Sequence, residues 1–179
     1  MSQLPFCCTH VSWCDALRER DIVPPPPVVT LADTCVWTSA ITPFAVLCTA
    51  PTFTLTSSDG IAVSPATVSA SSPYIVEFFE ASCQHCQQAA SQLCREKVAV
   101  YAVDAANEDA STLSAFHRQY APTCHFPLLL DPHLSVSGRF GVTAVPTVYV
   151  VSGGRIAYAG AGLDGVAGLD AAVARATGG

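Results

Sequence analysis

The chain carries little charge, and positive charge is the scarcer sign. Only 12% of its 179 residues are charged, the formal net charge is −6, and Lys97 is the sole lysine. A protein that binds nucleic acid needs a basic surface to neutralise phosphates. The sequence has no such basic stripe, so no nucleic-acid partner is expected.

A full-length transmembrane run is also missing, although 50% of the residues are hydrophobic. The charge-free apolar stretch Thr34–Ala50 is shorter than the roughly 20 residues of a membrane span. It follows the tetraproline Pro24–Pro27, which is typical of a stiff linker. Arg18 and Arg20 lie upstream, as in the basic flank of a signal sequence. Residues 1–49 are therefore expected to be an extension. It is either a degenerate signal or anchor that would allow membrane association, or a segment upstream of the true start.

The remaining residues, 50–179, have the length of one domain. Short apolar runs predict strands, and apolar residues three and four positions apart predict helices. The expected order is a hairpin at 53–63, a strand at 74–79, a helix at 83–95, a strand at 98–103, a helix ending at 120, a strand at 126–130, a helix at 132–140, strands at 147–151 and 156–159, and a helix at 162–176. This order predicts an α/β domain with a mixed sheet.

The motif Cys83-Gln84-His85-Cys86 follows a predicted buried strand and opens the next helix. Two sulfurs one helical turn apart can bond to each other, and unpaired N–H groups at the helix start favour a thiolate at Cys83. Cys83 is therefore the expected nucleophile, and Cys86 is the expected resolving thiol. A zinc site would need a second pair of ligands at finger spacing, and haem attachment would need histidine where Gln87 stands.

Seven further cysteines bring the total to nine, an odd number that rules out complete pairing within the chain. Most are expected to be small buried apolar residues, because a chain of this length can build a core without a disulfide framework. Cys94 is expected in the core. Cys124 and His125, with His117 nearby in sequence, lack a fourth metal ligand, so no metal site is expected.

Four stretches occur together in a characteristic order and spacing. They are Ala50–Leu55 with Asp59-Gly60, Val76–Phe79 leading into Cys83–Cys86, Phe126–Pro132, and Gly141–Thr147 followed by an apolar strand. Together they resemble the thioredoxin fold, and more narrowly the TlpA/ResA-like thiol–disulfide oxidoreductases of bacterial envelopes. The resemblance covers about residues 50–179. It implies a three-layer α/β/α fold with a mixed central sheet and an N-terminal β-hairpin.

The resemblance also assigns roles. Glu77 stands six residues before the nucleophile, where thioredoxins carry a buried acid that moves the proton of the resolving thiol. Pro146 is the candidate cis-proline, and Val145 and Thr147 beside it would bind an extended substrate.

Four positions differ from the common family pattern, and one of them is Glu80, which stands where a small residue is common. Gln84 and His85 replace the Gly-Pro often found between the cysteines, and His85 can tune the redox couple through its charge. Ser82 stands where tryptophan is common.

The expected function is protein thiol–disulfide exchange with no organic cofactor, because the Cys83–Cys86 pair itself carries two electrons. Partners would be a protein disulfide or dithiol and a redox donor or acceptor. The resemblance implies an extracytoplasmic place in a bacterial envelope, and a cytoplasmic one stays open. One alternative is a peroxiredoxin-like peroxide reductase, although Glu80 stands where that chemistry needs Thr or Ser. The other is a non-enzymatic thioredoxin-like module that binds a metal or a partner.

Overall fold

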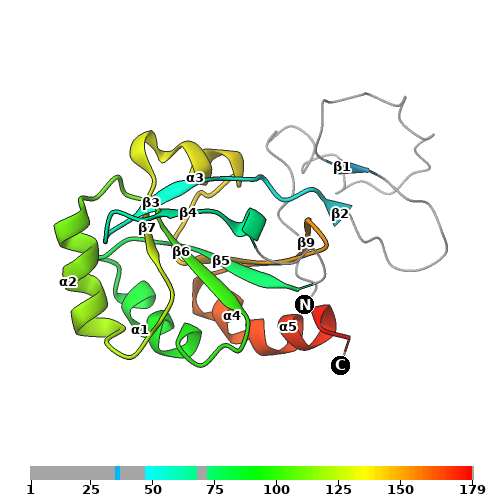
Figure 1. Ribbon diagram of the computed structural model, residues 1–179. Helices are drawn as coiled ribbons and strands as arrows, with labels where there is room; N and C mark the ends of the chain where they lie inside the picture. The colour runs from blue at the N-terminus through cyan, green and yellow to red at the C-terminus, as the bar shows by residue number, and fades with distance from the viewer. Residues whose placement is uncertain (1–34, 37–46, 68–71, 179) are drawn as a thin grey trace, which may run out of the picture.

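The computed structural model describes residues 35–36, 47–67 and 72–178 (Figure 1). Its main sheet has seven strands in the order β4-β3-β7-β6-β5-β8-β9, and β1 and β2 form a separate pair. The strands are β1 (Cys35–Val36), β2 (Leu47–Cys48), β3 (Leu55–Ser57), β4 (Ala62–Val63), β5 (Tyr74–Phe79), β6 (Ala99–Asp104), β7 (Leu128–Leu130), β8 (Thr147–Ser152) and β9 (Arg155–Ala161). The helices are α1 (Gln84–Leu93), α2 (Ala110–Tyr120), α3 (Ser135–Arg139), α4 (Gly162–Ala167) and α5 (Leu169–Ala176), with 3₁₀ turns at Pro65–Thr67 and Pro132–Leu134.

The sheet is mixed, as the sequence predicts. Strands β5, β6 and β7 run parallel, whereas β8 is antiparallel to β5 and β9 is antiparallel to β8. On the other side, β3 is antiparallel to both β4 and β7. The carboxyl ends of β5 and β6 therefore share one edge with the amino end of β8. Phe79 lies opposite Asp104, and Phe78 lies opposite Thr147.

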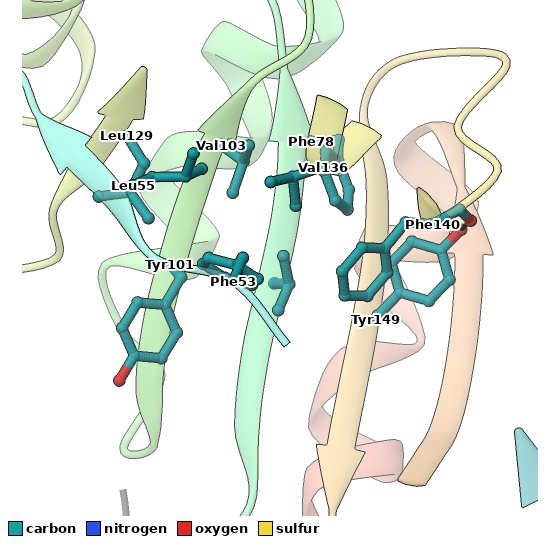
Figure 2. Packing of buried hydrophobic residues seen from close by; sticks show 10 residues of the cluster. Phe53, Leu55, Phe78, Tyr101, Val103, Leu129, Val136, Phe140 and Tyr149 are labelled. Carbon is teal, nitrogen blue, oxygen red and sulfur yellow. Dashed lines mark hydrogen bonds between the residues drawn. The ribbon is translucent and has the colours of Figure 1, made fainter. Parts of the chain in front are cut away.

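The core has two sides because β5 is buried on both faces. Val76 and Phe78 belong to the cluster under α3, where Phe78 packs against Phe140 and Tyr149 with ring centroids 5.0 and 5.9 Å apart (Figure 2). Ile75 and Phe79 face the helices α1, α2, α4 and α5 on the other side. The result is the three-layer, thioredoxin-like α/β/α fold that the resemblance implies.

The residues at the junction between the predicted extension and the predicted domain contact the sheet. Thr49 forms a β-bridge with Arg155, and the Ala50 N–H donates to the Gly154 carbonyl at 2.9 Å. The rest of the predicted extension, including the tetraproline, lies mostly outside the described residues. Among the helices of the described part, none combines the length and apolar character required to cross a bilayer.

The predicted helix at 162–176 is wrong in one respect, because it breaks into α4 and α5 at Gly168. Tyr158 packs against the backbone at this point. Its hydroxyl donates to the Gly165 carbonyl at 2.8 Å, and a Cβ at Gly168 would lie 2.3 Å from that hydroxyl oxygen. The Tyr158 side chain therefore occupies the space that a larger residue at Gly168 would need. Residue periodicity does not report such a contact from a neighbouring strand.

The expectations for Cys94 and Cys124 also need correction. The two residues form a disulfide, with Cα atoms 4.9 Å apart. Cys94 caps the C-terminal end of α1, and Cys124 lies in the turn after α2. The packing of α1 against α2 brings them together over a sequence separation of 30 residues. The described residues contain no cluster of three or more metal-ligand side chains, and the His117 ring nitrogen lies 3.2 Å from the Cys124 carbonyl oxygen.

Replacing Asp131 by Ala should lower the free energy of unfolding by about 2–4 kcal/mol. This carboxylate is 1% exposed and accepts from the N–H groups of Val136 and Ser137 at 3.0 and 2.8 Å. The substitution leaves these buried donors without their acceptor at the start of α3.

Chemical denaturation measures the loss. Ser135→Ala is the control, since it removes a single hydrogen bond from an exposed hydroxyl to Asp131 and should cost about 0.5–1 kcal/mol. Equal losses in the two variants would contradict this account of Asp131.

Candidate active site

Cys83 is the N-cap residue of α1. Its backbone is extended, with φ −74° and ψ 114°, and its sulfur accepts a hydrogen bond from the Cys86 N–H at 3.3 Å. The Cys83 carbonyl accepts from the Gln87 N–H at 3.1 Å, which begins the helix. The sulfur therefore lies at the positive end of the helix dipole and is partly exposed.

Cys86 lies one turn into α1 and is fully buried. It packs with Phe79, Ala90 and Leu113 on the face of the sheet that carries α1 and α2. Burial, the hydrogen bond with Cys83 and the nearby Glu77 carboxyl all raise the pKa of this thiol. The two cysteines thus differ in the way that attacking and resolving thiols must: one is accessible, and the other is sequestered.

Glu77 lies in the middle of β5 and is 3% exposed. Its alternation with Val76 and Phe78 directs the side chain to the α1 face, and its charge acts on Cys86. One carboxyl oxygen, Oε1, has no hydrogen-bond partner among the described residues. Burial raises the pKa of this carboxyl to about 8. The site therefore contains a carboxyl group that still holds its proton at a pH where an exposed glutamate has lost it.

The loop before β8 lies opposite Cys83 in the candidate site. The Val145–Pro146 peptide bond is cis, and the Cys83 thiol donates to the Val145 carbonyl oxygen at 3.8 Å. The Pro146 carbonyl accepts from the Gly162 N–H at 2.8 Å. The Thr147 hydroxyl is largely buried and donates to the Ala144 carbonyl at 2.7 Å, so this side chain braces the loop.

The remaining predicted site residues lie at the solvent-facing rim. Gln84 and His85 are exposed on the first turn of α1. Ser82 is exposed and donates a short hydrogen bond to Glu80, which is half-buried. The structure therefore brings Glu77, Cys83, Cys86 and the Val145–Thr147 loop together and leaves the two residues between the cysteines facing solvent.

Sequence reasoning missed Glu108, which holds the loop that leads to Cys83. Its carboxylate Oε2 accepts from the Ala81 N–H at 3.0 Å. The Glu108 N–H in turn donates to the buried carboxylate of Asp104, which also accepts from the Ala106 N–H. Burial is the main cause that raises the pKa of both carboxyls. The polar stretch at the end of β6 is the available signal, because the ends of adjacent parallel strands meet at one sheet edge.

The fold and the dithiol place this chain in the thioredoxin-like class. Residues 46–159 match the AhpC/TSA family, and the chain belongs to that family. No curated protein matches the chain in sequence.

Three solved structures illustrate the similarity. The thio-disulfide isomerase of Thermus thermophilus is 29% identical with a TM-score of 0.59, covering 70% of this chain and 92% of that one. DsbF of Mycobacterium tuberculosis is 23% identical with a TM-score of 0.61, covering 70% and 95%. A secreted disulfide oxidoreductase of the same organism is 19% identical with a TM-score of 0.59, covering 69% and 95%. The last two likenesses show the fold alone.

The substitution Glu77→Gln should change how stability depends on pH. The pKa of Glu77 is raised from 4.5 to about 8, so between these values the folded chain holds a proton that the unfolded chain has released. This contribution to stability is fully present below pH 4.5 and is lost as the pH rises through 8. The loss from this one group is about 1.4 kcal/mol per pH unit.

Urea unfolding of both proteins across this pH window measures the effect. The free energy of unfolding should fall less steeply with pH in Glu77→Gln than in the wild type. Glu80→Gln, at the half-buried rim, is the control for replacing a glutamate near the site. A Glu77→Gln slope as steep as that of the wild type would contradict the raised pKa.

Proposed function

We propose that this chain is a thiol–disulfide oxidoreductase that exchanges its Cys83–Cys86 pair with disulfides or dithiols of protein substrates. One observation carries the proposal. The partly exposed Cys83 sulfur lies at the N-terminus of α1, 3.8 Å from the Val145 carbonyl oxygen of the cis-proline loop, with the buried Cys86 one turn behind it. Family membership and the oxidoreductases among the similar structures support this chemistry.

Exchange begins at Cys83. Its thiolate attacks one sulfur of a substrate disulfide, a bond from Cys83 to the substrate forms, and the second substrate sulfur leaves as a thiolate that takes up a proton. The Cys86 N–H, 3.3 Å from the attacking sulfur, stabilises negative charge there before the attack. The helix dipole acts in the same direction.

Cys86 completes the cycle. Its thiolate attacks the Cys83 sulfur, the bond to the substrate breaks, and the Cys83–Cys86 disulfide forms. The substrate gains two electrons, and the chain loses two. Because Cys86 is buried and its pKa is raised, its proton needs a nearby acceptor. Glu77 supplies that acceptor, since a carboxylate with a pKa of about 8 is a much stronger base than one in water.

The cis-proline loop and the helix rim would contact the substrate. An extended substrate segment lies along the backbone of Val145 and Pro146, while the Thr147 side chain holds that loop in place. His85 and Gln84 face solvent beside Cys83 and tune the reduction potential through the charge and hydrogen bonds that they present. A redox donor or acceptor protein would use the same face to restore the starting state.

An extracytoplasmic location in a bacterial envelope fits this function. One of the similar structures is a secreted disulfide oxidoreductase, and the Cys94–Cys124 disulfide is of a kind that persists in oxidising compartments.

Peroxide reduction is the second candidate, and the AhpC/TSA family match favours it. The Cys83 thiolate would attack a peroxide oxygen to form a sulfenic acid and release water or an alcohol. Cys86 would then condense with the sulfenic acid to give the disulfide and water. Peroxide consumption by the reduced chain, compared with its reduction of a peptide disulfide, distinguishes the two activities.

Single cysteine substitutions test the assigned order of attack. Cys86→Ser should accumulate a mixed disulfide between Cys83 and a peptide disulfide, because the resolving thiol is gone. Cys83→Ser should accumulate none at Cys86, because that thiol is fully buried. Peptide mapping by mass spectrometry after acid quenching assigns the adduct to its cysteine among the nine of the chain. An adduct on Cys86 in the Cys83→Ser variant would reverse the two roles.

The role of Glu77 as proton acceptor can be tested in a chain that keeps both Cys83 and Cys86. The measured quantity is the lifetime of the mixed disulfide between Cys83 and the peptide. Glu77→Gln should slow its resolution on the order of 10²-fold. The wild-type rate should rise as the pH passes through about 8, where Glu77 ionises. Rapid acid quenching followed by mass analysis gives the rate. Glu80→Gln is the matched control, and a similar slowing in that variant would remove Glu77 from the mechanism.

A further inference from the structure

One member of the second cysteine pair lies at the end of the helix that carries the candidate active site. Cys94 caps the end of α1 that is opposite to Cys83, and its disulfide to Cys124 joins that end to the turn after α2. We call this bond the tether disulfide. It encloses α2 and the central strand β6 within one covalent loop.

Cys86 and Cys94 are too far apart to bond to each other within one folded molecule. Cys94 follows Cys86 by eight residues along the helix, which is about 12 Å of helix axis, whereas a disulfide needs Cα atoms within about 7 Å. Cys124 packs in the same apolar cluster as Cys86, and the double variant described below tests whether the active-site pair exchanges with it.

The two sulfurs of the tether disulfide differ in their accessibility. Cys124 is 5% exposed and packs with Phe116, Ala121 and Leu128. Cys94 is half-buried and lines a cavity of about 300 Å³ together with Ala99, His125 and other residues of the adjoining loop and strand. This cavity lies at the amino end of β6, whereas Cys83 lies beyond the carboxyl end of β5.

From this arrangement we infer that the tether disulfide is a second thiol-reducible site, which small thiols enter through the cavity and attack at the Cys94 sulfur. A thiolate bonds to Cys94, the Cys94–Cys124 bond breaks, and Cys124 leaves and takes up a proton. The Cys124 thiol then has an acceptor in place, the Ala90 carbonyl oxygen 3.9 Å from its sulfur. A second thiol attacks the mixed disulfide, so two thiols are oxidised to one disulfide and the pair becomes a dithiol.

This site should be reduced more slowly than the active-site pair. The leaving sulfur departs into an apolar pocket, which disfavours the thiolate that must form there. Reduction leaves the end of α1 held by non-covalent contacts, among them the hydrogen bond from the Cys94 N–H to the Ala90 carbonyl at 3.1 Å. The redox state of the tether disulfide thus determines whether the end of α1 is covalently linked to the turn after α2.

The test follows each cysteine separately in the full-length, oxidised chain. Dithiothreitol, a neutral dithiol, is added without denaturant. Samples taken at intervals are quenched in acid and unfolded, all free thiols are then alkylated, and mass spectrometry measures labelling at Cys94 and Cys124 and at Cys83 and Cys86. The tether disulfide should be reduced at least about 10-fold more slowly than the active-site pair, yet completely while the protein is folded. Its reduction only when denaturant accompanies the dithiothreitol, or at the same rate as the active-site pair, would overturn the inference.

The entry route is tested at Ala99, which is exposed and lines the cavity. Ala99→Trp should slow reduction of the tether disulfide at least about fivefold and leave the active-site pair unchanged, because bulk at the cavity obstructs approach to Cys94. Ala99→Ser is the matched control, and Ala99→Leu replaces the tryptophan variant if that one does not fold. An unchanged rate in the folded bulky variant would exclude this route.

The Cys83→Ala/Cys86→Ala double variant separates this inference from the proposed function. Its tether disulfide should be reduced at the wild-type rate even though the variant has no active-site couple. Loss of reducibility in the double variant would show that the active-site cysteines mediate the reaction and would overturn direct entry. Absence of exchange activity in the wild type would instead overturn the proposed function alone.

Discussion

The candidate chemistry depends on removing a carboxyl group and a thiol from water at the same place. Strand β5 is buried on both faces, so Glu77 cannot reach solvent from its position within the strand. Helix α1 covers the same face and brings Cys86 over it. Desolvation raises the pKa of both groups, which makes the thiol hard to ionise and the carboxylate a better base. Burial therefore makes the Cys86 thiol hard to deprotonate, and the same burial makes the Glu77 carboxylate a stronger base that can accept the proton.

The sheet topology supplies the rest of the site. Because β8 runs antiparallel to β5, the loop that enters β8 meets the loop that leaves β5. That crossing places the Val145 carbonyl beside Cys83. The parallel neighbour β6 ends at the same edge, where Glu108 binds the Ala81 N–H and positions the segment before the nucleophile. Three segments far apart in sequence thus converge on one sulfur.

Local sequence patterns predicted the features that depend on residues close together in the sequence. The alternation and apolar runs located β5, β6 and β8, and the family resemblance correctly indicated the three-layer fold. The position of Cys83 at a helix start followed from its spacing, and the resemblance indicated the burial of Glu77. Strand and helix ends shifted, as in the hairpin, where β3 begins at Leu55. The predicted helix at 132–140 is a 3₁₀ turn followed by the short α3, because His133 and Leu134 adopt left-handed backbone angles.

The features that sequence reasoning missed all depend on contacts between distant elements. The Cys94–Cys124 bond requires α1 and α2 to pack in a particular register, and no spacing rule encodes that register. The space beside Gly168, where the helix divides, is filled by Tyr158 from β9. Glu108 acquires its role only when the ends of β5 and β6 are neighbours. In each case the residue type was visible in the sequence, but its partner was not.

The disulfide between Cys94 and Cys124 also has a mechanical consequence. It closes a ring over a sequence separation of 30 residues, so a force applied to the two ends of the chain cannot extend that segment. At about 3.3–3.6 Å per residue, roughly 100 Å of contour length is withheld from stretching. A pore that threads the oxidised chain would have to admit more than one strand of polypeptide at the ring. A channel that admits a single strand is therefore compatible with the reduced chain and not with the oxidised one.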